Sequence, residues 1–393
     1  MKLNRPLCVL GLICVVLTVL AWFVGREDRT SKASPDLSKV LSEHSSVPNP
    51  STPIFAKSEH ATQPTNTNAE EETSSLENED QRLRRLFIEA VGSPPGLPDD
   101  DIEPYLQQHG RSASTLLAAW RVSGSDQYLR EAATKFPDDP RVQFALLTTT
   151  EFVFGESGDN PLLGDHRKWT DRFKQSSPDN ALAYYFSAEE YFQQKQPDQA
   201  LKEIMTASTK PVFDDYSLAT MQDNEYGQMF LTAGHPPAEA QVEGFMTAMW
   251  TSGRYGYNMR WLGGDLAIAE ATCITNSDLS GAQNLAKSAI TLAREMRTGG
   301  FCGQSPLFGF QIEETALKKL PPDVPLDWLG KTPSTALVDL AREQEHLRAT
   351  AGQFLKAVDQ STQPEILEFI NRAQRSGDMT AAMQWLTALH PTR

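Results

Sequence analysis

The chain has 393 residues, of which 22% are charged and 39% hydrophobic, and its formal net charge is −15. These proportions are ordinary for a globular protein, and the length is ample for a full core. A chain this acidic, without a Lys/Arg stripe, repels phosphate backbones, so nucleic acid is disfavoured as a partner.

The first predicted element is a membrane span, because the run Pro6–Gly25 contains no charged residue. A helix of 20 residues rises about 30 Å, which matches the hydrocarbon core of a bilayer. Lys2 and Arg5 precede the run without an acid between them, whereas residues 26–29 carry balanced charge. The positive-inside rule therefore places residues 1–5 in the cytoplasm and the rest of the chain beyond the membrane.

A cleaved signal peptide is the rival interpretation of this run. Cleavage after Gly25 would put Phe23 at position −3, where a small residue is required, and the run is longer than a usual signal core. A lipoprotein signal is disfavoured too, because Ile13 precedes Cys14. We therefore expect an uncleaved signal-anchor.

Residues 26–80 are rich in Ser, Thr, Pro, Asn and Glu and show no lasting apolar periodicity. Such a segment buries too little apolar surface to offset its ordering entropy, so we expect a disordered linker. The chain has no usable Asn-x-Ser/Thr site, since Asn49 is followed by Pro50. This absence favours a bacterial inner-membrane protein whose bulk faces the periplasm.

Residues 81–393 read as one all-α domain, and the clearest pattern in it runs from Pro178 to Pro211. Small residues at Ala188 and Ala200 would let two antiparallel helices approach closely, with Tyr184, Tyr191, Ile204 and Ala207 around that contact. At these positions the segment resembles the tetratricopeptide (TPR) repeat, although Ser187 replaces a Leu and Pro211 comes one residue early. The resemblance, which is degenerate elsewhere, implies a solenoid-like stack of helical hairpins that binds a protein or peptide.

Other segments have the same helical period. We expect helices over five further ranges, with a turn at Asn276–Asp278 between two of them and another at Gly377–Asp378: Asp126–Phe136, Leu262–Ile274, Leu279–Arg297, Pro364–Ser376 and Met379–Leu389.

No motif for catalysis, a cofactor or a metal stands out. The seven histidines are scattered, with no two of them three or four residues apart, and HExxH, P-loop, GxSxG and helix-opening GxGxxG patterns are absent. We therefore predict no cofactor, no metal and no catalytic residue.

Two cysteines, Cys273 and Cys302, lie beyond the anchor, where disulfides are permitted. The helix predicted over Leu279–Arg297 is about 28 Å long and separates them by far more than the roughly 7 Å that a disulfide tolerates between α-carbons. We expect both to be thiols.

The candidate binding surface is the stretch Trp250–Trp261, which gathers aromatic and arginine side chains around glycines. These residue types are enriched at binding hot spots, and the glycines, with Gly263 and Gly264 just beyond, suggest a loop between hairpins. Core packing is the competing interpretation of the same side chains. The residues nominated for protein binding are Arg254, Tyr257, Arg260 and Trp261.

The sequence thus favours a membrane-anchored TPR-like scaffold or adaptor over an enzyme. An all-α carbohydrate-active enzyme of the α/α toroid type is the alternative. That enzyme would need two carboxylates facing a cleft in which Trp250, Tyr257 and Trp261 serve as sugar platforms. A purely structural spacer is a third possibility.

Overall fold

The computed structural model describes residues 79–92, 94–153, 166–253, 255–299 and 305–391. Over these residues the chain is helical, with no strand beyond the isolated bridges Asn180–Val212 and Leu326–Lys331. None of the helices in these ranges is long and apolar enough to cross a membrane. The run 6–25 and nearly all of the linker 26–80 lie outside the described residues, so the span and the linker stay predictions.

The first helices begin and end at residues that favour helix boundaries. Ser112 forms a capping box with Thr115, and Gly124 ends the same helix in the left-handed conformation at φ 72°. The helix predicted over Asp126–Phe136 is confirmed as α7. This part of the chain comprises α4 (Glu79–Gly92), α5 (Asp99–His109), α6 (Ala113–Ser123), α7 (Asp126–Lys135) and α8 (Pro140–Val153).

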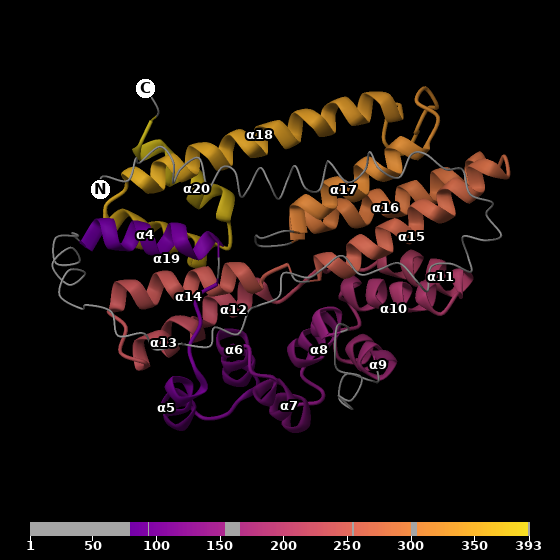
Figure 1. Cartoon of the computed structure of the whole chain (residues 1–393). Coiled ribbons are helices and arrows are strands. Elements are labelled where there is room, and N and C mark those ends of the chain that lie inside the picture. Colours follow the sequence, from indigo (N-terminus) through magenta and orange to yellow (C-terminus); the bar gives the residue numbers. More distant parts are fainter. Residues whose placement is uncertain (1–78, 93, 154–165, 254, 300–304, 392–393) are drawn as a thin grey trace, which may run out of the picture. The chain divides into compact units, whose positions relative to one another are not determined.

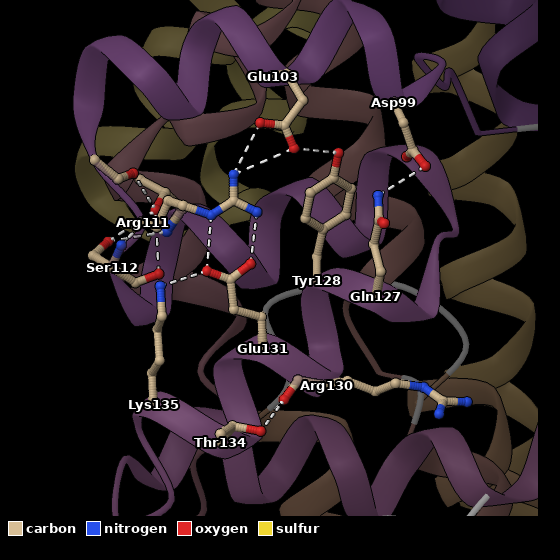
Figure 2. Close-up of polar contacts among 12 residues, drawn as sticks. Asp99, Glu103, Arg111, Ser112, Gln127, Tyr128, Arg130, Glu131, Thr134 and Lys135 are labelled. Atoms are coloured by element: carbon tan, nitrogen blue, oxygen red, sulfur yellow. Dashed lines mark hydrogen bonds and ion pairs between the residues drawn. The ribbon is translucent and has the colours of Figure 1, made fainter.

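One arginine ties the turn between α5 and α6 to its neighbours (Figure 2). Arg111 donates from Nε and Nη2 to the two oxygens of Glu131 in α7, at 2.8 and 2.6 Å, and from Nη1 to Glu103 in α5 at 2.9 Å. Lys135 donates to Glu131 as well, at 2.6 Å. The bidentate geometry fixes α5 against α7 more firmly than a single ion pair would.

The segment predicted as a repeat is a helical hairpin. Ala188 and Ala200 are both completely buried, and Tyr184 and Tyr191 are half-buried against the core. The helices in this part are α9 (His166–Ser176), α10 (Ala181–Gln193), α11 (Pro197–Ala207) and α12 (Ser217–Asp223). From α5 to α11 each helix packs on the next one along the chain.

In the middle of the chain, two glycines allow a close contact between helices. A Cβ built on Gly244 in α14 would lie 2.4 Å from the backbone nitrogen of Gly227 in α13, so only glycine fits there. This part comprises α13 (Glu225–Thr232), α14 (Pro237–Thr251), α15 (Gly256–Thr275), α16 (Leu279–Gly299) and α17 (Ser305–Lys319). The predicted helix Leu279–Arg297 and the turn before it are confirmed.

The last helices include a long one that crosses between two groups of neighbours (Figure 1). α18 (Pro333–Gln360) packs near its ends on α17 and α20, whereas no side chain of residues 341–353 is buried. α19 (Gln363–Ser376) and α20 (Met379–Leu389) form the hairpin predicted around Gly377–Asp378, which confirms it.

The beginning and the end of the described chain share one aromatic core. Phe87 of α4 lies 6.2 to 6.4 Å, between ring centroids, from Phe245 of α14, Phe354 of α18 and Phe369 of α19. In a pure solenoid each repeat contacts only its neighbours. Here the chain folds back so that α4 packs on α14 and α19.

Candidate functional site

The nominated stretch holds a short turn at Ser252 and Gly253 between α14 and α15, and the residues from Gly256 onward are helical, so the loop is shorter than predicted. Trp250 lies in α14, and α15 already begins at Gly256, six residues before the predicted start. Gly253 lies in the turn, at φ 75°, whereas Gly256 and Gly263 mark close packing. A Cβ at Gly256 would lie 2.6 Å from Phe308 and one at Gly263 2.6 Å from Ile312, both in α17. Burial against α17 outweighs the low helix propensity of glycine.

The nominated residues differ in their surroundings. Tyr257 is half-buried, with its ring 5.0 Å from that of Phe308, and the guanidinium of exposed Arg260 lies 5.8 Å from the same ring. Trp261 is 68% exposed. Arg254 lies outside the described residues.

An apolar strip runs along the exposed face of α15. Trp261, Gly264 and Ile268 are spaced three and four residues apart and therefore share one face of the helix. Ile268 is 50% exposed, and the position of Gly264 is exposed with nothing within 4 Å of its Cβ direction. We call these three residues the α15 strip. Apolar side chains that are exposed next to one another are typical of interaction sites.

A buried acid of α10 is hydrogen-bonded to α15 one helical turn before the strip begins. Asn258 of α15 donates from Nδ2 to Oε2 of Glu189 in α10 at 3.3 Å, and both side chains are at most 3% exposed. Burial raises the pKa of the Glu189 carboxyl to about 7. Oδ1 of Asn258 accepts no hydrogen bond from the described residues. The contact between α10 and α15 is therefore polar, and it includes a buried hydrogen-bond acceptor without a donor among the described residues.

The next acid along α10 faces α9. Oε2 of Glu190 lies 3.8 Å from Nη1 of Arg167 and 3.7 Å from Nδ1 of His166. Arg167 also donates to Ser187 at 3.2 Å and places its guanidinium 4.6 Å from the ring centre of Tyr191. These contacts hold α9 against α10.

Sequence reasoning missed both acids, although it had a signal for them. In α10 every residue from Ala181 to Glu190 except Tyr184 is buried, because the segment is apolar on nearly all sides. A helix without a polar face is surrounded by protein, so acids within it are buried as well.

The three aromatic residues considered as sugar platforms have different neighbours. Trp250 donates from Nε1 to the carbonyl of Ala90 in α4, Tyr257 packs on α17, and Trp261 is exposed. A cavity of about 20 Å³ near Arg121 and Tyr226 has room for about one water molecule.

Cys273 is a half-buried free thiol, and Cys302 lies outside the described residues, so their separation stays a prediction. Within the described ranges, no group of three or more His, Cys, Asp or Glu side chains is arranged to hold a metal ion. No protein-family model, no curated protein and no solved structure matches the chain.

Proposed function

We propose that this protein is a membrane-anchored scaffold whose helical domain binds a protein or peptide partner through the α15 strip. The exposure of Trp261 carries the proposal, because a tryptophan that is 68% exposed contributes little to the stability of its own fold. Tryptophan is also the side chain most enriched among binding hot spots. Arg260 beside it supplies hydrogen-bond donors of the kind that surround such anchors.

The backbone supports this role by fixing the strip in advance. α15 packs on α10, α16 and α17, and the contacts of Gly256 and Gly263 with α17 hold it rigidly. A side chain on a rigid helix loses little conformational entropy when it binds, so more of its interaction energy appears as affinity.

The TPR-like scaffold is the second part of the proposal. Successive packing from α5 to α11 and the complete burial of Ala188 and Ala200 support hairpin repeats in this part of the chain. Repeat scaffolds bind peptides and proteins on extended surfaces. The return of the chain onto itself would set this scaffold apart from an open solenoid.

The membrane anchor is the third part. The uncharged run Pro6–Gly25, with Lys2 and Arg5 before it, would hold the protein in a bacterial inner membrane as a single-pass span. The helical domain would then face the periplasm, joined to the anchor by the polar segment 26–78.

The test compares two variants, each of which removes an equally exposed apolar side chain. The full chain, Trp261→Ala and Met205→Ala are each used to capture proteins from solubilised envelope membranes, and captured proteins are quantified by mass spectrometry. Met205 is also 68% exposed but lies on α11, so it controls for the loss of an exposed apolar side chain. We expect one protein whose recovery falls about tenfold or more with Trp261→Ala only.

Thermal unfolding separates binding from stability. Trp261→Ala should melt within about 2 °C of the wild type, because an exposed side chain has little packing to lose. Tyr257→Ala would be less informative, since that ring packs on Phe308. Equal recovery of every captured protein by all three chains would refute the proposal.

A further inference from the structure

A groove lies away from α15, between α4, α14 and the residues just before α5. The groove has a volume of about 300 Å³, which is large enough for a side chain or a small ligand. Its walls are held by hydrogen bonds from α14: Trp250 donates to the carbonyl of Ala90, and Thr247 donates to that of Pro95. The lining residues are Leu86, Glu89, Ala90, Pro95, Gly96 and Glu243.

The charged groups in this lining are all negative. Glu243 is 7% exposed, and its Oε2 is 2.7 Å from Nδ1 of His235. Glu89 lies on the opposite side, on α4, and is 67% exposed. The carboxyl end of α4, which carries the negative end of the helix dipole, adds to the same potential.

Basic side chains lie near both carboxylates, but none of them lines the groove. His235 contacts Glu243, Arg85 lies 3.8 Å from Glu89, and Arg82 of α4 is paired with Glu239 at 2.9 Å. Burial raises the pKa of the Glu243 carboxyl, and His235 opposes this shift. A buried carboxylate in this position gains from an additional cation that replaces its lost hydration.

We propose that this groove binds a lysine or arginine side chain of an extended basic peptide. The ammonium or guanidinium group would lie between Glu89 and Glu243, and its methylene stem would lie along Leu86, Ala90 and Pro95. A mixed apolar and acidic lining suits such a side chain, because its stem is apolar and its head is charged. The net charge of the whole chain, −15, favours a basic partner in the same way.

The inference does not depend on the α15 strip. A peptide held by Glu89 and Glu243 would contact α4 and α14, whereas Trp261 and Ile268 lie on α15. Trp261→Ala should therefore leave peptide binding unchanged, and loss of the groove should leave the α15 partner bound. Failure of either proposal can be recognised without the other.

The test is calorimetric titration of the full chain in detergent micelles with five-residue peptides. The probes are acetyl-Ala-Ala-X-Ala-Ala-amide with X as Arg, Lys, Gln or Glu. We expect the Arg and Lys peptides to bind with a Kd below about 1 mM and the Gln peptide to bind about tenfold or more weakly. Raising the salt concentration should weaken binding of the Arg peptide.

Variants of the two carboxylates locate the binding. Glu243→Gln should weaken binding of the Arg peptide about tenfold or more. Glu345→Gln, which removes an exposed carboxylate from α18, should leave that binding unchanged. Glu89→Gln is a second groove variant and is expected to fold normally, because Glu89 is exposed. Melting curves identify any variant that is unfolded.

Several outcomes would overturn the proposal. These are equal affinity for the Arg and Gln peptides, no saturable binding of either basic peptide, or an Arg-peptide affinity that neither Glu89→Gln nor Glu243→Gln changes. Butylamine that binds as tightly as the Lys peptide would show that the groove takes small amines and does not recognise a peptide.

Discussion

Gly263 of α15 lies directly against Ile312 of α17: a Cβ built on Gly263 would be 2.6 Å from Cγ1 of that isoleucine. The next residue, Gly264, has nothing within 4 Å of the equivalent position. The two adjacent glycines of this helix therefore have different structural roles. The first allows α15 and α17 to approach, whereas the second lies in the exposed α15 strip.

Alanine at these two positions should therefore change stability in opposite directions. Gly263→Ala is expected to lower the free energy of unfolding by about 1–3 kcal/mol through overpacking against Ile312. Gly264→Ala should raise it by about 0.5–1 kcal/mol, because alanine is the better helix former and meets no neighbour. Urea denaturation of the full chain measures both. Equal effects of the two substitutions would show that α15 and α17 are not in close contact.

The α10–α11 hairpin gives a second prediction. Ala188 is completely buried in it, so Ala188→Leu should cost about 1–3 kcal/mol of unfolding free energy. Ala349→Leu is the matched control, because Ala349 is exposed in the middle of α18 and has room for the larger side chain. If Ala188→Leu melts at the same temperature as the wild type and the control, α10 and α11 do not pack closely at Ala188.

Much of the helical pattern could be read from the sequence, because hairpins leave local signals. The small residues Ala188 and Ala200, the turn at Gly377 and the turn at Asn276–Asp278 are all short-range features that fix where helices begin, end or touch. Helix existence and order follow from such signals with little help from the rest of the fold.

Contacts between distant segments could not be read in this way. The packing of Phe87 on Phe245 and Phe369 joins residues far apart in the chain, and no local period encodes it. The same limit misplaced the start of α15, since glycine at 256 favours a loop unless Phe308 is known to pack on it. The burial of Glu189 likewise depends on α15, which covers α10.

The network in Figure 2 predicts a loss of stability in acid. Hydrogen bonds from Arg111 are the main reason that the pKa of Glu131 is lowered from 4.5 to about 2. The folded state thus keeps Glu131 ionised where the unfolded state would protonate it, so this stabilisation is present above pH 4.5 and is lost as the pH falls toward 2. Because the pair is partly exposed, we expect about 1–2 kcal/mol.

Arg111→Met measures this contribution. The variant should be less stable than the wild type at pH 6, and the difference should shrink as the pH approaches 2, as followed by urea denaturation at each pH. Arg348→Met removes an arginine from an exposed pair with Glu345, at 3.6 Å, and should have little effect at any pH. A constant deficit of Arg111→Met across the pH range would mean that the side chain acts through packing alone.

The buried glutamates near the contact between α10 and α15 predict the opposite pH dependence of stability. Burial raises the pKa of Glu189 from 4.5 to about 7, and it raises those of Glu295 and Glu270 to about 7 and about 8. Below pH 4.5 these groups are protonated in both states. Between pH 4.5 and 7 the unfolded chain releases its protons while the folded chain holds them, so the free energy of unfolding falls as the pH rises.

Glu189→Gln isolates one part of this dependence, because glutamine is neutral at every pH. The unfolding free energy of the wild type relative to Glu189→Gln should fall by about 3 kcal/mol between pH 4.5 and pH 8. Part of the decline should persist in the variant, since Glu295 and Glu270 are unchanged. Glu345→Gln, at an exposed position, should run parallel to the wild type. If Glu189→Gln also runs parallel to it, the Glu189 carboxyl is hydrated in the folded protein and α10 is not covered by α15 at that point.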